Sequence, residues 1–110
     1  MIWQGDVNAA TLRLLEHAGS PPVAMNLTGH ETLSIRAVAT ELARLMGKPV
    51  QFVGKEAPTA LLSNSSKAFA VLGKPEMPIV NVLEWIAQWI VRGGKMLGKP
   101  THFQTRDGKY

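Results

Sequence analysis

The chain has 110 residues, 45% of them hydrophobic, which fits one small globular domain. Its formal net charge of +4 comes from Lys and Arg spread along the whole chain, without the basic runs or basic aromatic helices that indicate nucleic-acid binding. It has no cysteine, which excludes disulfides and thiolate metal sites.

The apolar segments are too short, and too often broken by polar residues, to span a membrane. Residues 1–6 also lack the basic and apolar regions of a secretory leader. We therefore expect a cytoplasmic protein whose partners include neither a membrane nor nucleic acid.

The first predicted helix covers residues 6–18. Asp6 is placed to cap its free backbone N–H groups, and Gly19 followed by two prolines ends it. The apolar positions share one face of this helix, and Arg13 is expected to point away from that face.

The next three elements read as strand, helix, strand. Residues 23–28 are predicted to be a strand, Ser34 to cap a helix that ends at Gly47, and residues 50–53 to be a second strand. This order predicts a small βαβ unit with parallel pairing.

The second half of the chain is expected to be mainly helical. After an irregular stretch at residues 55–63, Asn64 is predicted to cap a short helix that ends at Gly73. A last helix covers residues 79–92, and the tail has no clear periodicity. The predicted fold is therefore α/β, a single domain over residues 1–110 with about four helices and two or three short, mostly parallel strands.

Two tryptophans stand one turn apart on the last predicted helix. Trp85 and Trp89 widen its apolar arc beyond that of a half-buried helix. Either both indoles cover the core of this domain, or they form a contact surface for another lobe or subunit, where aromatic residues are enriched.

The motifs that carry common chemistries are missing. No glycine fingerprint for a dinucleotide occurs, and the glycines at 93–98 follow a predicted helix instead of a strand, with Pro100 in the place of a magnesium-binding Ser or Thr. His17, His30 and His102 lie too far apart for ligand spacing on one element. We expect no catalytic, cofactor-binding or metal-binding residue.

Six short segments follow one another in a characteristic order: residues 3–8, WQGDVN; 26–29, NLTG; 33–36, LSIR; 64–68, NSSKA; 72–75, LGKP; and 98–103, GKPTHF. In this order they resemble the C-terminal half of extended short-chain dehydrogenases/reductases, the NAD-dependent epimerase/dehydratase-like family. The resemblance covers essentially the whole chain. The chain differs, however, from the members that act on sugar nucleotides: those carry an arginine that contacts the diphosphate shortly before the segment that corresponds to residues 64–68, and this chain has none there.

The resemblance implies the substrate-binding lobe of an oxidoreductase that uses NAD or NADP. The Rossmann lobe that would bind the cofactor is absent, as is the Tyr-x-x-x-Lys pair, because Tyr110 is the only tyrosine. The resemblance also implies that four residues form part of the wall of a small-molecule pocket: Gln4, Glu56, Thr59 and Leu62. The expected partner is the missing Rossmann lobe or a second copy of the chain. The alternative is a free-standing, self-associating interaction module.

Overall fold

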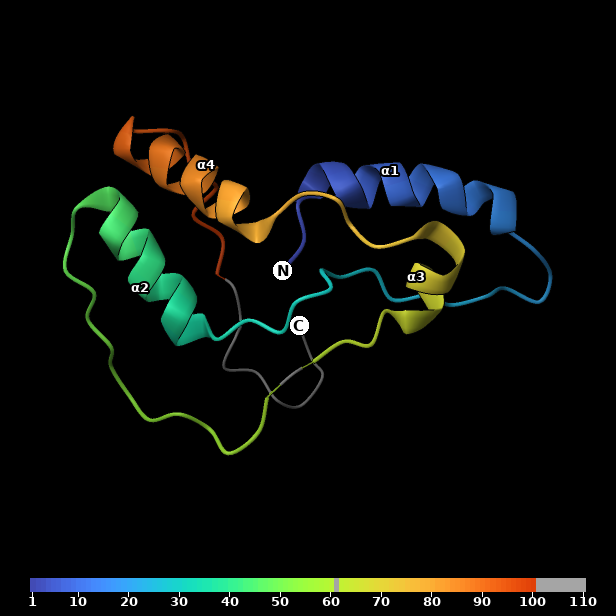
Figure 1. Cartoon of the computed structure of the whole chain (residues 1–110), viewed down its shortest axis with the longest axis horizontal. Coiled ribbons are helices and arrows are strands. Elements are labelled where there is room, and N and C mark those ends of the chain that lie inside the picture. The colour runs from blue at the N-terminus through green and yellow to red at the C-terminus, as the bar shows by residue number, and fades with distance from the viewer. Residues whose placement is uncertain (61, 101–110) are drawn as a thin grey trace.

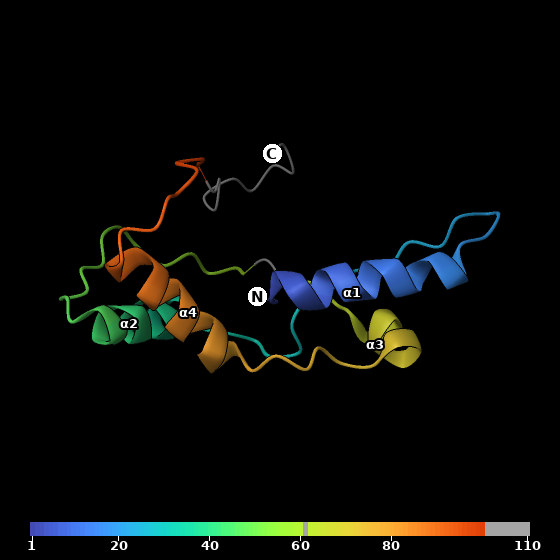
Figure 2. The ribbon, with the colours of Figure 1, turned by 90° about the horizontal axis from the view of Figure 1, so that it is seen from above.

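Helices are the only regular secondary structure in the part of the chain that its computed structural model describes, residues 1–60 and 62–100. The helices are α1 (Gln4–Leu14), extended by a 3₁₀ turn η1 (Leu15–His17), then α2 (Ile35–Met46), α3 (Ser66–Leu72) and α4 (Ile79–Val91). They form two pairs, because α2 lies beside α4 and α3 lies beside α1 in both views (Figures 1 and 2). Thr101, His102, Phe103 and Tyr110 lie outside the described residues.

The pair α2 and α4 holds most of the buried apolar side chains. Ala43 of α2 is buried, as are Val82, Leu83 and Ala87 of α4. The alanines allow the helix backbones to approach closely, and the contact between α2 and α4 is the most extensive between any two helices described. This pair is the nearest that the described chain comes to a core.

Helix α2 has both of the ends that the sequence predicts. Ser34 caps its start, since its Oγ accepts a hydrogen bond from the Ala37 N–H at 3.3 Å. Gly47 ends it in the left-handed conformation with φ 64°, which glycine adopts without a steric penalty. The prediction for α4 is likewise confirmed, within one residue at its end.

The first helix begins earlier than predicted. It starts at Gln4, with Trp3 in the cap position and no side-chain cap. Asp6 therefore lies inside the first turn, and its Oδ2 accepts a hydrogen bond from the Met77 N–H at 3.2 Å. The prediction that Asp6 caps the helix was wrong. Its carboxylate instead accepts from Met77, and this hydrogen bond joins α1 to the segment that precedes α4.

The predicted α/β fold is wrong. No strand occurs in residues 1–60 or 62–100, so the two expected strands and the βαβ unit are absent. Strands need a neighbouring chain for their backbone hydrogen bonds. Residues 23–28 are instead joined to the α3 region by two side-chain-to-backbone hydrogen bonds, one in each direction. Lys67 Nζ donates to the Ala24 carbonyl at 3.3 Å, and Asn26 Nδ2 donates to the Asn64 carbonyl at 3.2 Å.

The second expected strand, residues 50–53, lies on a wide arc beside α2 (Figure 1). Its apolar side chains are exposed, and Val53 is 87% exposed. The Phe52 ring contacts Arg36, whose guanidinium carbon lies 4.2 Å from the ring centroid. Local β propensity therefore did not decide the structure of this segment, since no strand is available to pair with it.

The chain exposes more surface than a compact monomer of the same mass. A compact monomer of 12.0 kDa exposes about 6,000 Å², whereas this chain exposes 9077 Å². The eleven undescribed residues would expose about 1,700 Å² if they were fully extended. The difference between the exposed area of this chain and that of a compact monomer is larger than this, so the described residues also expose more surface than a compact monomer would. The radius of gyration is 16.5 Å, against about 13 Å for a compact chain of this length.

Candidate functional site

A hollow of about 440 Å³ lies between α1 and α3, and we name it the interhelical hollow. Its apolar lining includes Ile2, Ala10, Leu27, Phe69 and Leu72. Four charged residues also line it: Asp6, Arg13, Lys74 and Glu76. Its volume and its mixture of an apolar lining with a few charged groups are those of a small-molecule site.

The charged residues reach the hollow from two elements. Asp6 and Arg13 are seven residues apart on α1 and therefore share one face of the helix. Lys74 and Glu76 follow the end of α3, where Gly73 has φ 82°. No ion pair within the described part of the chain involves Arg13, Lys74 or Glu76. Both signs of charge are thus available to a ligand.

The second surface is apolar, and we name it the tryptophan face. It borders a hollow of about 600 Å³ lined by eight residues: Trp3, Gln4, Val82, Trp85, Ile86, Trp89, Ile90 and Met96. None of these eight side chains is charged. Trp85 is 43% exposed and Trp89 is 56% exposed, so neither indole is enclosed by the core of the chain.

The four residues expected to line a substrate pocket lie in different places. Gln4 lines the hollow of the tryptophan face. Glu56 and Thr59 lie on the exposed arc that follows α2, and Leu62 is 73% exposed. None of the last three lines either of the two hollows. Their role in substrate binding stays a prediction.

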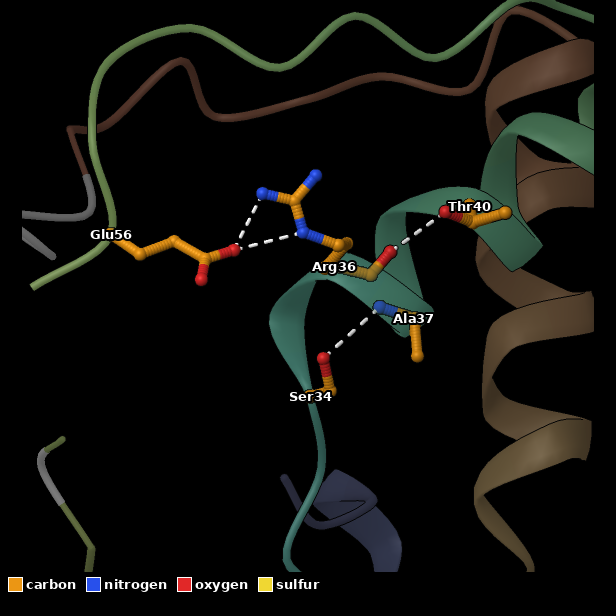
Figure 3. A network of polar contacts seen from close by, with 5 residues as sticks. All are labelled: Ser34, Arg36, Ala37, Thr40 and Glu56. Carbon is orange, nitrogen blue, oxygen red and sulfur yellow. Dashed lines mark hydrogen bonds and ion pairs between the residues drawn. The ribbon is translucent and has the colours of Figure 1, made fainter.

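Glu56 is already paired (Figure 3). Its Oε1 accepts from Arg36 Nε at 2.8 Å and from the neighbouring guanidinium nitrogen. Arg36 also lies over the Phe52 ring. Its contacts with Phe52 and Glu56 therefore connect the arc that follows α2 to the start of that helix. A substrate that used Oε1 of Glu56 would have to compete with Arg36 for it.

A second exposed ion pair perturbs the titration of its members. The hydrogen bonds from the Arg44 guanidinium lower the pKa of the Glu41 carboxyl below its ordinary value, and the same bonds raise the pKa of Arg44. Both residues are on α2 and line neither hollow. This ion pair therefore joins two side chains on the surface of α2 and belongs to neither hollow.

Two classes of site receive no support from the described residues. No group of three or more His, Asp or Glu side chains in the described ranges is arranged to hold a metal ion; His102 lies outside these ranges. Likewise, no helix found between residues 1 and 100 has both the length and the apolar character needed to cross a bilayer.

Comparisons with known proteins add no relative. No family model matches the chain, and no curated protein or solved structure is detectably similar to it.

The interhelical hollow was not predicted from the sequence. Arg13 was expected to point away from the apolar face, yet it lines the hollow beside Ala10. The seven-residue spacing of Asp6 and Arg13 could have indicated a shared helix face. Their meeting with Lys74 and Glu76 depends on the contact between α1 and α3, which no local pattern encodes.

Proposed function

We propose that the chain is the substrate-binding lobe of an NAD(P)-dependent epimerase/dehydratase-type oxidoreductase. In this proposal it contacts the substrate and sets specificity, while a Rossmann lobe holds NAD or NADP and the proton-transfer residues. The chain alone lacks a dinucleotide fingerprint and a Tyr-x-x-x-Lys pair. It is therefore not competent for hydride transfer by itself, and we place it in the cytoplasm with its partner lobe.

The observation that carries the proposal is the excess of exposed surface. The chain exposes 9077 Å², and this exceeds the surface of a compact monomer of its mass even after about 1,700 Å² is set aside for the undescribed residues. Only six apolar residues are buried in the described part, three of them alanines. A lobe that normally packs against a second lobe has these properties, because part of its core is completed by its partner.

The interhelical hollow is the best supported place for a substrate. It combines an apolar lining with two cations and two carboxylates, which suits a polar metabolite that carries both hydroxyl and anionic groups. Arg13 can present a planar pair of N–H donors to a carboxylate or phosphate, and Lys74 adds a point charge. The four residues that the family resemblance implies for the pocket wall, Gln4, Glu56, Thr59 and Leu62, do not line this hollow, and their role in substrate binding stays a prediction.

Calorimetric titration tests this proposal directly. NAD⁺, NADP⁺ and their reduced forms are expected to give no binding heat with the isolated chain. When the chain is mixed with a separately produced Rossmann lobe of this enzyme class, the complex should bind the dinucleotide. A dissociation constant below about 10 µM for the chain alone would show that it holds the cofactor itself, and the proposal would be wrong.

One observation favours a second candidate function. A free-standing interaction module without catalytic activity would explain the exposed, uncharged tryptophan face, since large apolar patches are uncommon on monomers. The two candidates differ in the partner that they require: a Rossmann lobe for the first and another copy of the chain for the second.

A further inference from the structure

We propose that the tryptophan face is a two-fold interface, in which α4 of one chain packs against α4 of a second copy. This inference rests on the second candidate function and names the surface and the symmetry of the self-association. Its test follows the mass of the chain, whereas the test of the first candidate follows dinucleotide binding, so the two can fail separately. Four properties of the described residues support it: the available area, the absence of charge, the fixed positions of the indoles and the shape of the face.

Helix α4 has an apolar arc that is wider than its contact with α2 requires. Leu83 and Ala87 are buried, whereas Trp85, Trp89 and Ile90 remain 43%, 56% and 40% exposed. A helix that is apolar over most of its circumference is normally covered on both sides. The tryptophan face is therefore an apolar side of α4 that no other helix of residues 1–60 and 62–100 covers.

The indoles are held in fixed positions before any partner arrives. Trp3 and Trp85 meet edge to face, with 5.7 Å between ring centroids, and Trp89 Nε1 donates to the Lys95 carbonyl at 3.2 Å. Two glycines make room for the rings, since a Cβ on Gly5 would collide with Trp3 and a Cβ on Gly94 with Trp89. Little side-chain entropy is lost when such a surface binds.

The chemistry of the face favours a second copy as its occupant. With no charged side chain among its eight lining residues, it offers no electrostatic complement to a charged partner. Two copies of the face can meet without repulsion, although each chain carries a net charge of +4. Charged residues are depleted in the same way at the centres of protein interfaces, where tryptophan is enriched.

Shape and area are consistent with self-pairing. In a two-fold interface, the same surface must supply both the projections and the recesses. Here Trp89 and Met96, which is 70% exposed, lie beside a hollow of about 600 Å³. A stable dimer needs about 800 Å² from each partner. The face offers the exposed parts of three tryptophans, Ile90 and Met96, which are between 37% and 70% exposed.

The test follows mass and tryptophan fluorescence together. All three tryptophans of the chain lie on the face, so intrinsic emission reports on this surface alone. Sedimentation equilibrium of the wild type at about 50 µM should give twice the chain mass of 12.0 kDa. On dilution, the mass should halve and the emission should shift to the red at the same midpoint.

Two variants locate the interface. Trp89→Arg places like charges opposite each other in a two-fold dimer and should weaken association at least tenfold. Gly94→Ala, which adds no charge, should also weaken it by displacing the Trp89 ring. Leu12→Arg is the matched control, because Leu12 is an exposed leucine of α1 outside the face. The dissociation constant of its dimer should lie within about twofold of that of the wild type.

Three outcomes would overturn the proposal. The first is a wild-type monomer at about 200 µM, which would leave the face to another partner such as the Rossmann lobe. The second is a dimer whose dissociation leaves the emission unchanged, which would place the contact elsewhere. The third is a folded Trp89→Arg variant, judged by far-ultraviolet circular dichroism, that dimerises as tightly as the wild type.

Discussion

The two helix pairs of this chain differ in how far each stabilises itself. Helices α2 and α4 bury Ala43, Val82, Leu83 and Ala87 between them, and α2 has a side-chain cap at its start and a left-handed glycine at its end. Helix α1 has no buried residue and no side-chain cap, and α3 buries only Ala68 and Leu72. The first pair therefore has more buried contacts of its own, whereas the second is open to a ligand or to another lobe.

Core truncation should separate the two pairs most clearly. Leu83→Ala removes a side chain that is 6% exposed and should lower the free energy of unfolding by about 2–4 kcal/mol through lost burial and a cavity. Leu12→Ala on α1 removes an exposed leucine and should cost less than about 0.5 kcal/mol. Urea denaturation of both variants measures the difference, and equal losses would remove the distinction between the pairs.

Two serines at helix starts sharpen the comparison at a smaller scale. Ser34→Ala removes the hydrogen bond to the Ala37 N–H and should destabilise the protein by about 1 kcal/mol. Ser65→Ala at α3 should cost nothing or stabilise slightly, because the Ser65 hydroxyl is buried without a hydrogen-bond partner among the described residues. Thermal unfolding of the two variants decides this, and a larger loss for Ser65→Ala would contradict it.

The smallest expected effect is a pH dependence on α2. The pKa of Glu41 is lower in the folded chain than its ordinary value of 4.5, because Arg44 donates hydrogen bonds to the ionised carboxylate. The stabilisation is therefore complete above the unfolded pKa and is lost as the pH falls through the folded pKa.

Glu41→Gln should flatten this part of the acid unfolding curve, because it removes the carboxylate that Arg44 stabilises. Because the Glu41–Arg44 pair is exposed, the difference should shrink in high salt. A Glu41→Gln curve that is superimposable on the wild type at low salt would show that the pair contributes nothing.

The sequence predicted well those elements whose signals are local. Ser34 and Gly47 mark the ends of α2 by their own chemistry, and the apolar periodicity of α4 does not depend on its neighbours. Residues 23–28 and 50–53 were misread because strand formation depends on a pairing partner. Their β-branched and aromatic residues indicate extended backbone, but they cannot indicate whether another strand lies beside it.

The candidate site was less predictable than the helices, for the same physical reason. Trp85 and Trp89 stand out in the sequence because one helix brings them together. Arg13 and Lys74 are separated by most of the chain and meet only through the contact between α1 and α3. A hollow built from two elements therefore remains hidden until the tertiary arrangement is known.

Native-state hydrogen exchange tests most directly the central claim, that the α2–α4 pair is held by its own buried contacts and the α1–α3 pair is not. We expect backbone amides of α2 and α4 to exchange only through global unfolding, and amides of α1 and α3 to exchange orders of magnitude faster through local opening. Protection of α1 equal to that of α4 in the isolated chain would contradict the account.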